Sequence, residues 1–62
     1  MKKKNNEAKI EKYFDVKGNT IFAVKILNLE TMNWLTVLRC KNIDVAESWA
    51  YEIAYSVSYN ID

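Results

Sequence analysis

The chain has 62 residues and a net charge of +1, and half of its residues are hydrophobic, with one glycine, one cysteine, no proline and no histidine. A chain this short can form one small domain, and a single cysteine excludes an intrachain disulfide. The absence of histidine excludes histidine-based metal sites and histidine-based acid–base catalysis. Stability must therefore come from close packing or from burial of further surface in an oligomer or complex.

The net charge conceals an uneven distribution along the chain. Residues 1–25 hold seven lysines and three acids, whereas residues 26–62 hold two bases and five acids. No apolar run follows the first lysines, and no stretch of about 18 uncharged apolar residues occurs. We therefore expect no signal peptide and no membrane contact, and a cytoplasmic location with a reduced thiol.

Residues 1–9 are polar and show no periodicity, so their ordering would be offset by little burial. We expect residues 1–9 to be a mobile basic tail and residues 10–62 to form a single α+β domain.

Aromatic and β-branched residues gather in three runs, which predict strands at residues 13–17, 20–28 and 34–42. Between the first two runs, Gly18-Asn19 predicts a two-residue type II′ turn. The result is a three-stranded antiparallel meander. Two registers of the second hairpin stay open, one with Val24 opposite Leu38 and one shifted by a residue, which groups Leu35 and Val37 with the large apolar side chains instead.

The last segment begins with a capping box, in which Asp44 and Glu47 can each accept from the other's backbone amide. A helix from this point carries one apolar stripe when 100° is taken per residue. The stripe contains Trp49, Ile53, Ala46, Val57, Ala50, Ile61 and Ala54. The sequence therefore predicts a β-β-β-α fold, in which one C-terminal α-helix packs on the sheet through this stripe, with Trp49 as a core anchor.

Three tyrosines, Tyr51, Tyr55 and Tyr59, lie on the opposite side of that predicted helix, near Glu52. Tyrosine provides a large contact area and tolerates both water and burial, so it is enriched where proteins meet. We take these four residues as a candidate partner-binding surface. Two plain alternatives are that the rings cover lysine side chains, or that the helix phase differs and one tyrosine belongs to the core.

Candidate catalytic residues are few. Ser48, Glu52 and Ser56 share one side of the predicted helix, but no glycine-rich loop lies near them to stabilise a developing charge. They are interpreted as solvated surface residues. We expect no catalytic residues, no metal site and no cofactor, and hence a protein that is not an enzyme.

Nucleic-acid binding is the alternative. Aromatic residues of the strands, such as Tyr13 and Trp34, could stack on bases, but the chain has only one arginine for specific base contacts. The cations that could contact phosphate are Lys2, Lys3, Lys4, Lys9, Lys12 and Arg39.

The first hypothesis is thus a small non-enzymatic protein–protein interaction module that self-associates as a homodimer or higher homo-oligomer and has a further protein partner. In general appearance the chain is similar to small phage or mobile-element proteins that bind and inhibit a host protein. The second hypothesis is a small nucleic-acid-binding protein that uses the lysine-rich N-terminus and the aromatic residues of the sheet.

Overall fold

The computed structural model describes residues 5–61, with side chains described from Glu7 onwards. Its elements in chain order are β1 (Asn5–Phe14), β2 (Thr20–Asn28), β3 (Asn33–Cys40), α1 (Ile43–Ile53) and β4 (Ala54–Asn60). Over these residues the strands form one four-stranded sheet in the order β3-β2-β1-β4. The strand β1 pairs antiparallel with β2 and parallel with β4, and β2 pairs antiparallel with β3.

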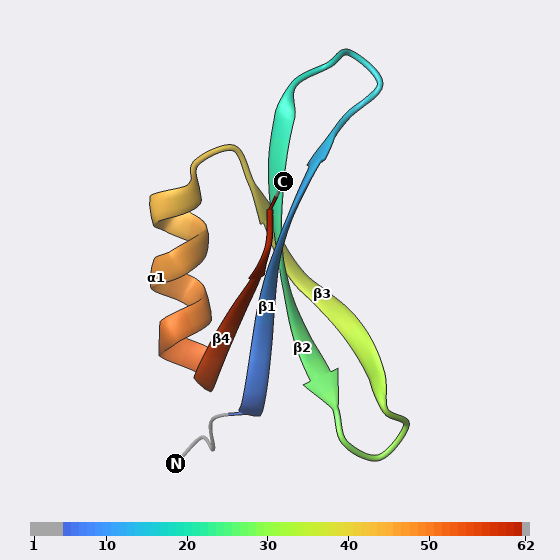
Figure 1. The fold of residues 1–62 in the computed structure, drawn as a ribbon, viewed down its shortest axis with the longest axis vertical. Coiled ribbons are helices and arrows are strands. Elements are labelled where there is room, and N and C mark those ends of the chain that lie inside the picture. The colour runs from blue at the N-terminus through green and yellow to red at the C-terminus, as the bar shows by residue number, and fades with distance from the viewer. Residues whose placement is uncertain (1–4, 62) are drawn as a thin grey trace.

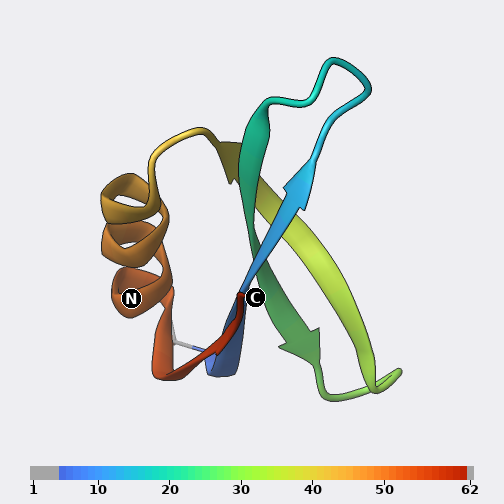
Figure 2. The ribbon, with the colours of Figure 1, turned by 45° about the horizontal axis from the view of Figure 1, so that its top comes forward.

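The helix α1 lies along one face of the sheet, and the other face, called the open face here, carries no helix among the described residues (Figure 1). Figure 2 shows the same arrangement from a second direction, with the strands twisted relative to one another beside the helix. The predicted α+β class with one helix packed on a sheet is therefore confirmed. The three-stranded meander with a C-terminal helix is wrong, because the sheet is mixed and has a fourth strand after the helix.

The helix ends at Ile53 rather than at the C-terminus of the chain, and Ala54 is already extended with φ −141° and ψ 154°. From Tyr51 to Ile61 every odd position is aromatic or apolar, and positions 52, 56, 58 and 60 between them are polar. Such alternation is typical of a strand, and serine, valine and tyrosine are only moderate helix formers. Pairing with β1 then decides the conformation in favour of a strand.

The first strand begins much earlier than the predicted boundary between tail and domain. Residues 5–9, which the sequence placed in a mobile tail, form the first half of β1. Ala8 is fully buried there, paired with Ile26 of β2 on one side and with Val57 of β4 on the other. Two neighbouring strands thus provide the burial that an isolated polar segment lacks. Residues 1–4 of that predicted tail lie outside the described residues.

The turn between β1 and β2 differs from the predicted type II′ turn. The Gly18 N–H donates to the Asp15 carbonyl at 3.0 Å, and the Asp15 N–H donates to the Asn19 carbonyl at 3.0 Å. Gly18 has φ +86°, so the left-handed residue is correctly located, but it is the last residue of a three-residue loop. The Asp15 carboxylate stabilises this loop by accepting from the Lys17 and Asn19 amides at 2.9 Å and 2.8 Å.

The hairpin of β2 and β3 contains both of the registers that the sequence left open. Val24 lies opposite Leu38, as in the first register, but Lys25 lies opposite Thr36. The register shift between Val24 and Lys25 leaves Val37 as the extra residue of a β-bulge. Each register therefore holds in one half of the hairpin.

The N-cap of α1 is Asn42, not Asp44. The Asn42 side chain accepts from the Asp44 N–H at 2.7 Å, and Asp44 lies in the first turn of the helix. The Glu47 carboxylate, which the capping box assigned to the Asp44 amide, instead accepts from the hydroxyl of Tyr59.

Among the described residues no helix has both the length and the apolar character needed to cross a membrane.

The core lies between α1 and the middle of the sheet. Ile10 and Val24 are the largest fully buried side chains, and they face the fully buried Ala46 and Ala50 of the helix. Ala46 and Ala50 confirm part of the predicted stripe, and Ile53, Val57 and Ile61 are partly buried against the core. Trp49 is not a core anchor, because 52% of it is exposed. The helix contacts the sheet through a face centred on its alanines, which turns Trp49 onto one flank.

The core assignment predicts unequal costs for two large-to-small substitutions. Ile10→Ala removes a fully buried side chain and should lower the free energy of unfolding by about 2–5 kcal/mol. Trp49→Ala should cost only about 1 kcal/mol, since half of the indole already lies in water. Chemical denaturation of both variants measures the difference. An equal or larger loss for Trp49→Ala would show that the helix packs in the phase expected from the sequence.

The cap assignment predicts a second difference. Asn42→Ala removes the side-chain acceptor at the start of α1 and should destabilise the protein by about 1 kcal/mol. Asp44→Ala removes only a first-turn acid and should cost about 0.3–1 kcal/mol, with the loss reduced by salt. Thermal unfolding at low and high ionic strength separates these cases. A larger, salt-independent loss for Asp44→Ala would restore Asp44 as the cap.

Candidate interaction surface

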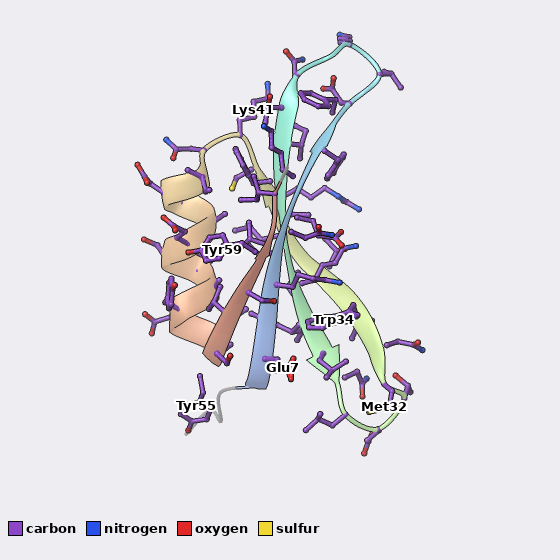
Figure 3. The ribbon with its side chains drawn as sticks, in the orientation of Figure 1. Glu7, Met32, Trp34, Lys41, Tyr55 and Tyr59 are labelled. Carbon is purple, nitrogen blue, oxygen red and sulfur yellow. The ribbon has the colours of Figure 1, made fainter. Side chains whose placement is uncertain are left out.

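Two of the three predicted interface tyrosines meet although they come from different elements. Tyr51 lies on α1 and Tyr59 on β4, and their hydroxyl oxygens are 3.2 Å apart. The Tyr59 hydroxyl also donates a hydrogen bond to Glu47, one turn before Tyr51 on the helix. This chain of hydrogen bonds ties the flank of α1 to the edge strand β4, and Figure 3 shows Tyr59 directed toward the helix.

The third tyrosine, Tyr55, lies on the same strand face as Tyr59, because residues four apart in a strand point to the same side. Its side chain projects beyond the C-terminal end of α1 (Figure 3). It is 75% exposed, compared with 53% for Tyr51 and 44% for Tyr59. The tyrosines thus gather at the β4 edge of the sheet rather than along one helix, and Tyr51, Tyr55 and Tyr59 are called the tyrosine surface below.

Hydrogen bonding controls the protonation of Tyr59. The hydrogen bond to the Glu47 carboxylate raises the pKa of the Tyr59 hydroxyl well above its usual value, and the hydrogen bond to Tyr51 raises it further. Removing the proton would place a phenolate beside a carboxylate. Both hydrogen bonds therefore favour the neutral form of Tyr59, in which its hydroxyl donates to Glu47.

Glu52, the fourth residue of the predicted surface, does not join the tyrosines. It follows Tyr51 by one residue and so points about 100° away around the helix. Together with Ser48 and Trp49 it lines a shallow hollow of about 320 Å³ on the helix. This hollow and the tyrosine surface lie on different flanks of α1.

The open face carries a compact group of ion pairs. Glu11 accepts from Lys25 on the neighbouring strand at 2.6 Å and lies 3.4 Å from the Lys9 Nζ on its own strand. The same Lys9 Nζ is 4.3 Å from the centroid of the Trp34 ring, which lies on the side of the sheet away from α1 (Figure 3). Both lysines thus already have partners within the protein.

A shallow hollow of about 490 Å³ lies beside these ion pairs on the open face, and Tyr13, Lys25 and Arg39 are among the residues that line it. Arg39, a predicted phosphate contact, is therefore close to Lys25 in space although far from it in sequence. Sequence reasoning missed Lys25. Its signal was the alternation of β2, which places it on the face opposite Val24.

The remaining cations predicted to bind nucleic acid do not gather on this face. Lys12 shares the helix-side face of β1 with Ile10, and its Nζ is 5.8 Å from the centroid of the Phe14 ring. Lys2, Lys3 and Lys4 lie outside the described residues. Of the predicted set, Lys9 and Arg39 are the cations on the open face within residues 5–61.

Comparison of the chain with protein-family models, with curated proteins and with solved structures found no match.

The ion pairs of the open face predict how stability depends on pH. Hydrogen bonding from Lys25 is the main reason that the pKa of Glu11 lies below its usual value of 4.5. A carboxylate with a lowered pKa in the folded state stabilises the fold above its unfolded pKa, and this contribution is lost as the pH falls further. The free energy of unfolding should therefore decline as the pH falls below about 4.5, and Glu11→Gln should flatten the decline.

Part of the acid sensitivity should survive in Glu11→Gln. Hydrogen bonds also hold the pKa of Asp15 below its usual value, and the bond from the backbone N–H of Asn19 has the largest effect on this pKa. Glu30→Gln, at an exposed position in the loop after β2, provides the matched control and should follow the wild-type curve. Denaturation at pH values from about 3 to about 6, in steps of roughly 0.5, measures the free energy of unfolding of wild type, Glu11→Gln and Glu30→Gln. Identical slopes for Glu11→Gln and wild type would contradict the assignment.

Proposed function

We propose that this protein is a non-enzymatic protein-interaction module that acts through the edge strand β4 and the tyrosine surface beside it, and that it self-associates. The observation that carries the proposal is the character of that edge. From Ala54 to Asn60 the strand contains no charged residue and no proline, although it forms an outer strand of the sheet. Edge strands of this kind are templates for pairing with another chain.

The opposite edge of the sheet differs in ways that support the choice of β4. The strand β3 contains a β-bulge at Val37 and a charged residue, Arg39. Bulges and charges are devices that discourage pairing at an edge. Of the two outer strands among the described residues, β4 is therefore the better candidate for binding.

The side chains beside β4 also suit an interface. Tyr51 and Tyr59 are preorganised, since each hydroxyl already has a hydrogen-bond partner, and both rings keep about half of their surface exposed. Burial of these rings would release water from apolar surface without leaving a hydroxyl unsatisfied. Less conformational entropy is lost when a side chain that is already held in place becomes buried.

Nucleic-acid binding is the second candidate function, and the hollow lined by Tyr13, Lys25 and Arg39 is the observation that favours it. It combines two cations with an aromatic ring on an open sheet face, and proteins that bind single-stranded DNA or RNA use the same combination. However, Glu11 pairs with Lys25 at 2.6 Å, and a phosphate would have to compete with this carboxylate. The rings of Tyr51 and Tyr59 require no such exchange, because their hydroxyl groups can keep their hydrogen bonds when a protein partner covers the rings.

The proposed function predicts that Tyr55→Glu weakens association at least tenfold without unfolding the protein. Tyr55 is 75% exposed, so the fold tolerates the charge, whereas an interface would bury an unpaired carboxylate at high cost. Tyr13→Glu is the matched control, because it introduces the same charge on the open face. Sedimentation over a range of protein concentrations measures the mass of each variant and of wild type.

Two results would count against the interaction module. Equal sedimentation of Tyr55→Glu and wild type would exclude the tyrosine surface as an interface. Salt-sensitive binding of single-stranded DNA that is lost in Arg39→Gln but kept in Tyr55→Glu would favour the second candidate function.

A further inference from the structure

The sequence of β4 has a twofold symmetry of its own. Residues 55–59 read Tyr-Ser-Val-Ser-Tyr, which is the same in both directions. The centre of this palindrome, Val57, is also the midpoint of β4 as it extends from Ala54 to Asn60. The symmetry of the side chains and the extent of the strand thus share one centre.

Antiparallel pairing of a strand with its own copy places a twofold axis perpendicular to the sheet, so that paired residues point to the same face. With the axis at Val57, the two valines lie opposite each other and Tyr55 lies opposite Tyr59 of the second copy. Ser56 then lies opposite Ser58 of the second copy on the open face. Each residue from 55 to 59 therefore lies opposite a residue of the same type in the second copy.

We propose that the partner of β4 is a second copy of this chain, paired antiparallel along β4 with Val57 on the twofold axis. The two sheets then join into one eight-stranded sheet with both helices on the same face. This inference rests on the proposed function, because it assigns the partner and the register of the interface proposed there.

Cross-strand chemistry supports this register. Aromatic pairs and serine pairs directly opposite each other stabilise antiparallel strands, whereas like charges in those positions would oppose pairing. The strand has no charge from Ala54 to Asn60, so twofold pairing brings no like charges together within it. Tyr55 would pack beside Tyr59 of the second copy, whose hydroxyl is already bound to Glu47 and Tyr51 of its own chain.

Other registers use the strand less completely. The axis at Val57 pairs all seven residues of β4, from Ala54 opposite Asn60 to Asn60 opposite Ala54. A shift that places the axis on Ser56 or Ser58 keeps the side chains on the correct faces but pairs fewer strand residues and sets Tyr55 or Tyr59 opposite Val57. The central register therefore buries the most surface and makes the most backbone hydrogen bonds.

Disulfide trapping tests the register. In a Cys40→Ala background, a single cysteine at the twofold axis faces its own copy at about 4.5–5.5 Å between Cα atoms, which a disulfide can span. We expect Val57→Cys chains to cross-link at least tenfold faster under mild oxidation than Val16→Cys chains. Val16 is a fully exposed loop position, so it reports random collisions.

The two serines provide an independent test that leaves Val57 intact. In the proposed register Ser56 lies about 8 Å from Ser56 of the second copy, too far for a disulfide, and the same holds for Ser58. Ser56→Cys and Ser58→Cys chains should therefore each cross-link no faster than the Val16→Cys control. A mixture of the two should form the mixed dimer at least tenfold faster than either forms a homodimer.

The outcomes separate the register from the interaction surface. Rapid cross-linking of Ser56→Cys or Ser58→Cys alone would place the axis elsewhere and overturn the register. If no β4 cysteine cross-links faster than Val16→Cys while wild type still sediments at twice its 7.3 kDa chain mass, the dimer does not form along β4. If in that case Tyr55→Glu still weakens association, the tyrosine surface survives as the interface while β4 pairing is excluded. A wild type that stays monomeric at all concentrations would exclude self-association altogether.

Discussion

The contact between the alanine face of α1 and the centre of the sheet is the interaction on which the rest of the structure depends. Ala46 and Ala50 are small enough to bring the helix close to β1 and β2, where Ile10 and Val24 fill the space between the layers. Two large, fully buried side chains are a small core for a domain, and burial of apolar area is the main force that stabilises folding. A close approach of the helix is therefore required, and it leaves the larger residues of α1 on its flanks.

That placement explains where the aromatic side chains lie. Because alanines occupy the contact face, Tyr51 is left on the flank that reaches β4, and Trp49 on another flank, half exposed. The hydrogen bonds of Tyr59 to Tyr51 and Glu47 then bind the edge strand to the helix. On the open face, which no helix covers among residues 5–61, Glu11 forms ion pairs with two lysines, Lys9 and Lys25. The two sides of the sheet therefore offer different chemistry to a partner, aromatic at the β4 edge and charged on the open face.

Spacing by four explains why the C-terminal segment was misread from sequence. Tyr51, Tyr55 and Tyr59 follow one another at intervals of four, which places them on one side of a helix and also on one face of a strand. The alternation of apolar and polar residues from Tyr55 to Ile61 distinguishes the strand from a helix, whereas the capping box before it predicts a helix that continues through these residues. The sequence also leaves two registers open for the second hairpin. Each register holds in one half of the strand pair, because the bulge at Val37 shifts the pairing by one residue.

Local chemistry in the sequence was enough to determine the α+β class, the strand at residues 20–28, the glycine with positive φ in the first turn and the alanines of the helix face. These features depend on periodicity and on the conformational freedom of single residues. The start of β1, the fourth strand and the exposure of Trp49 were decided only in the tertiary structure. Ala8 is buried because β2 and β4 lie on either side of it, and residues 54–60 become a strand because β1 offers hydrogen-bonding partners. The alternation from Tyr55 to Ile61 is compatible with a strand, but neither segment by itself shows that residues about 50 positions apart, such as Ala8 and Val57, pair with each other.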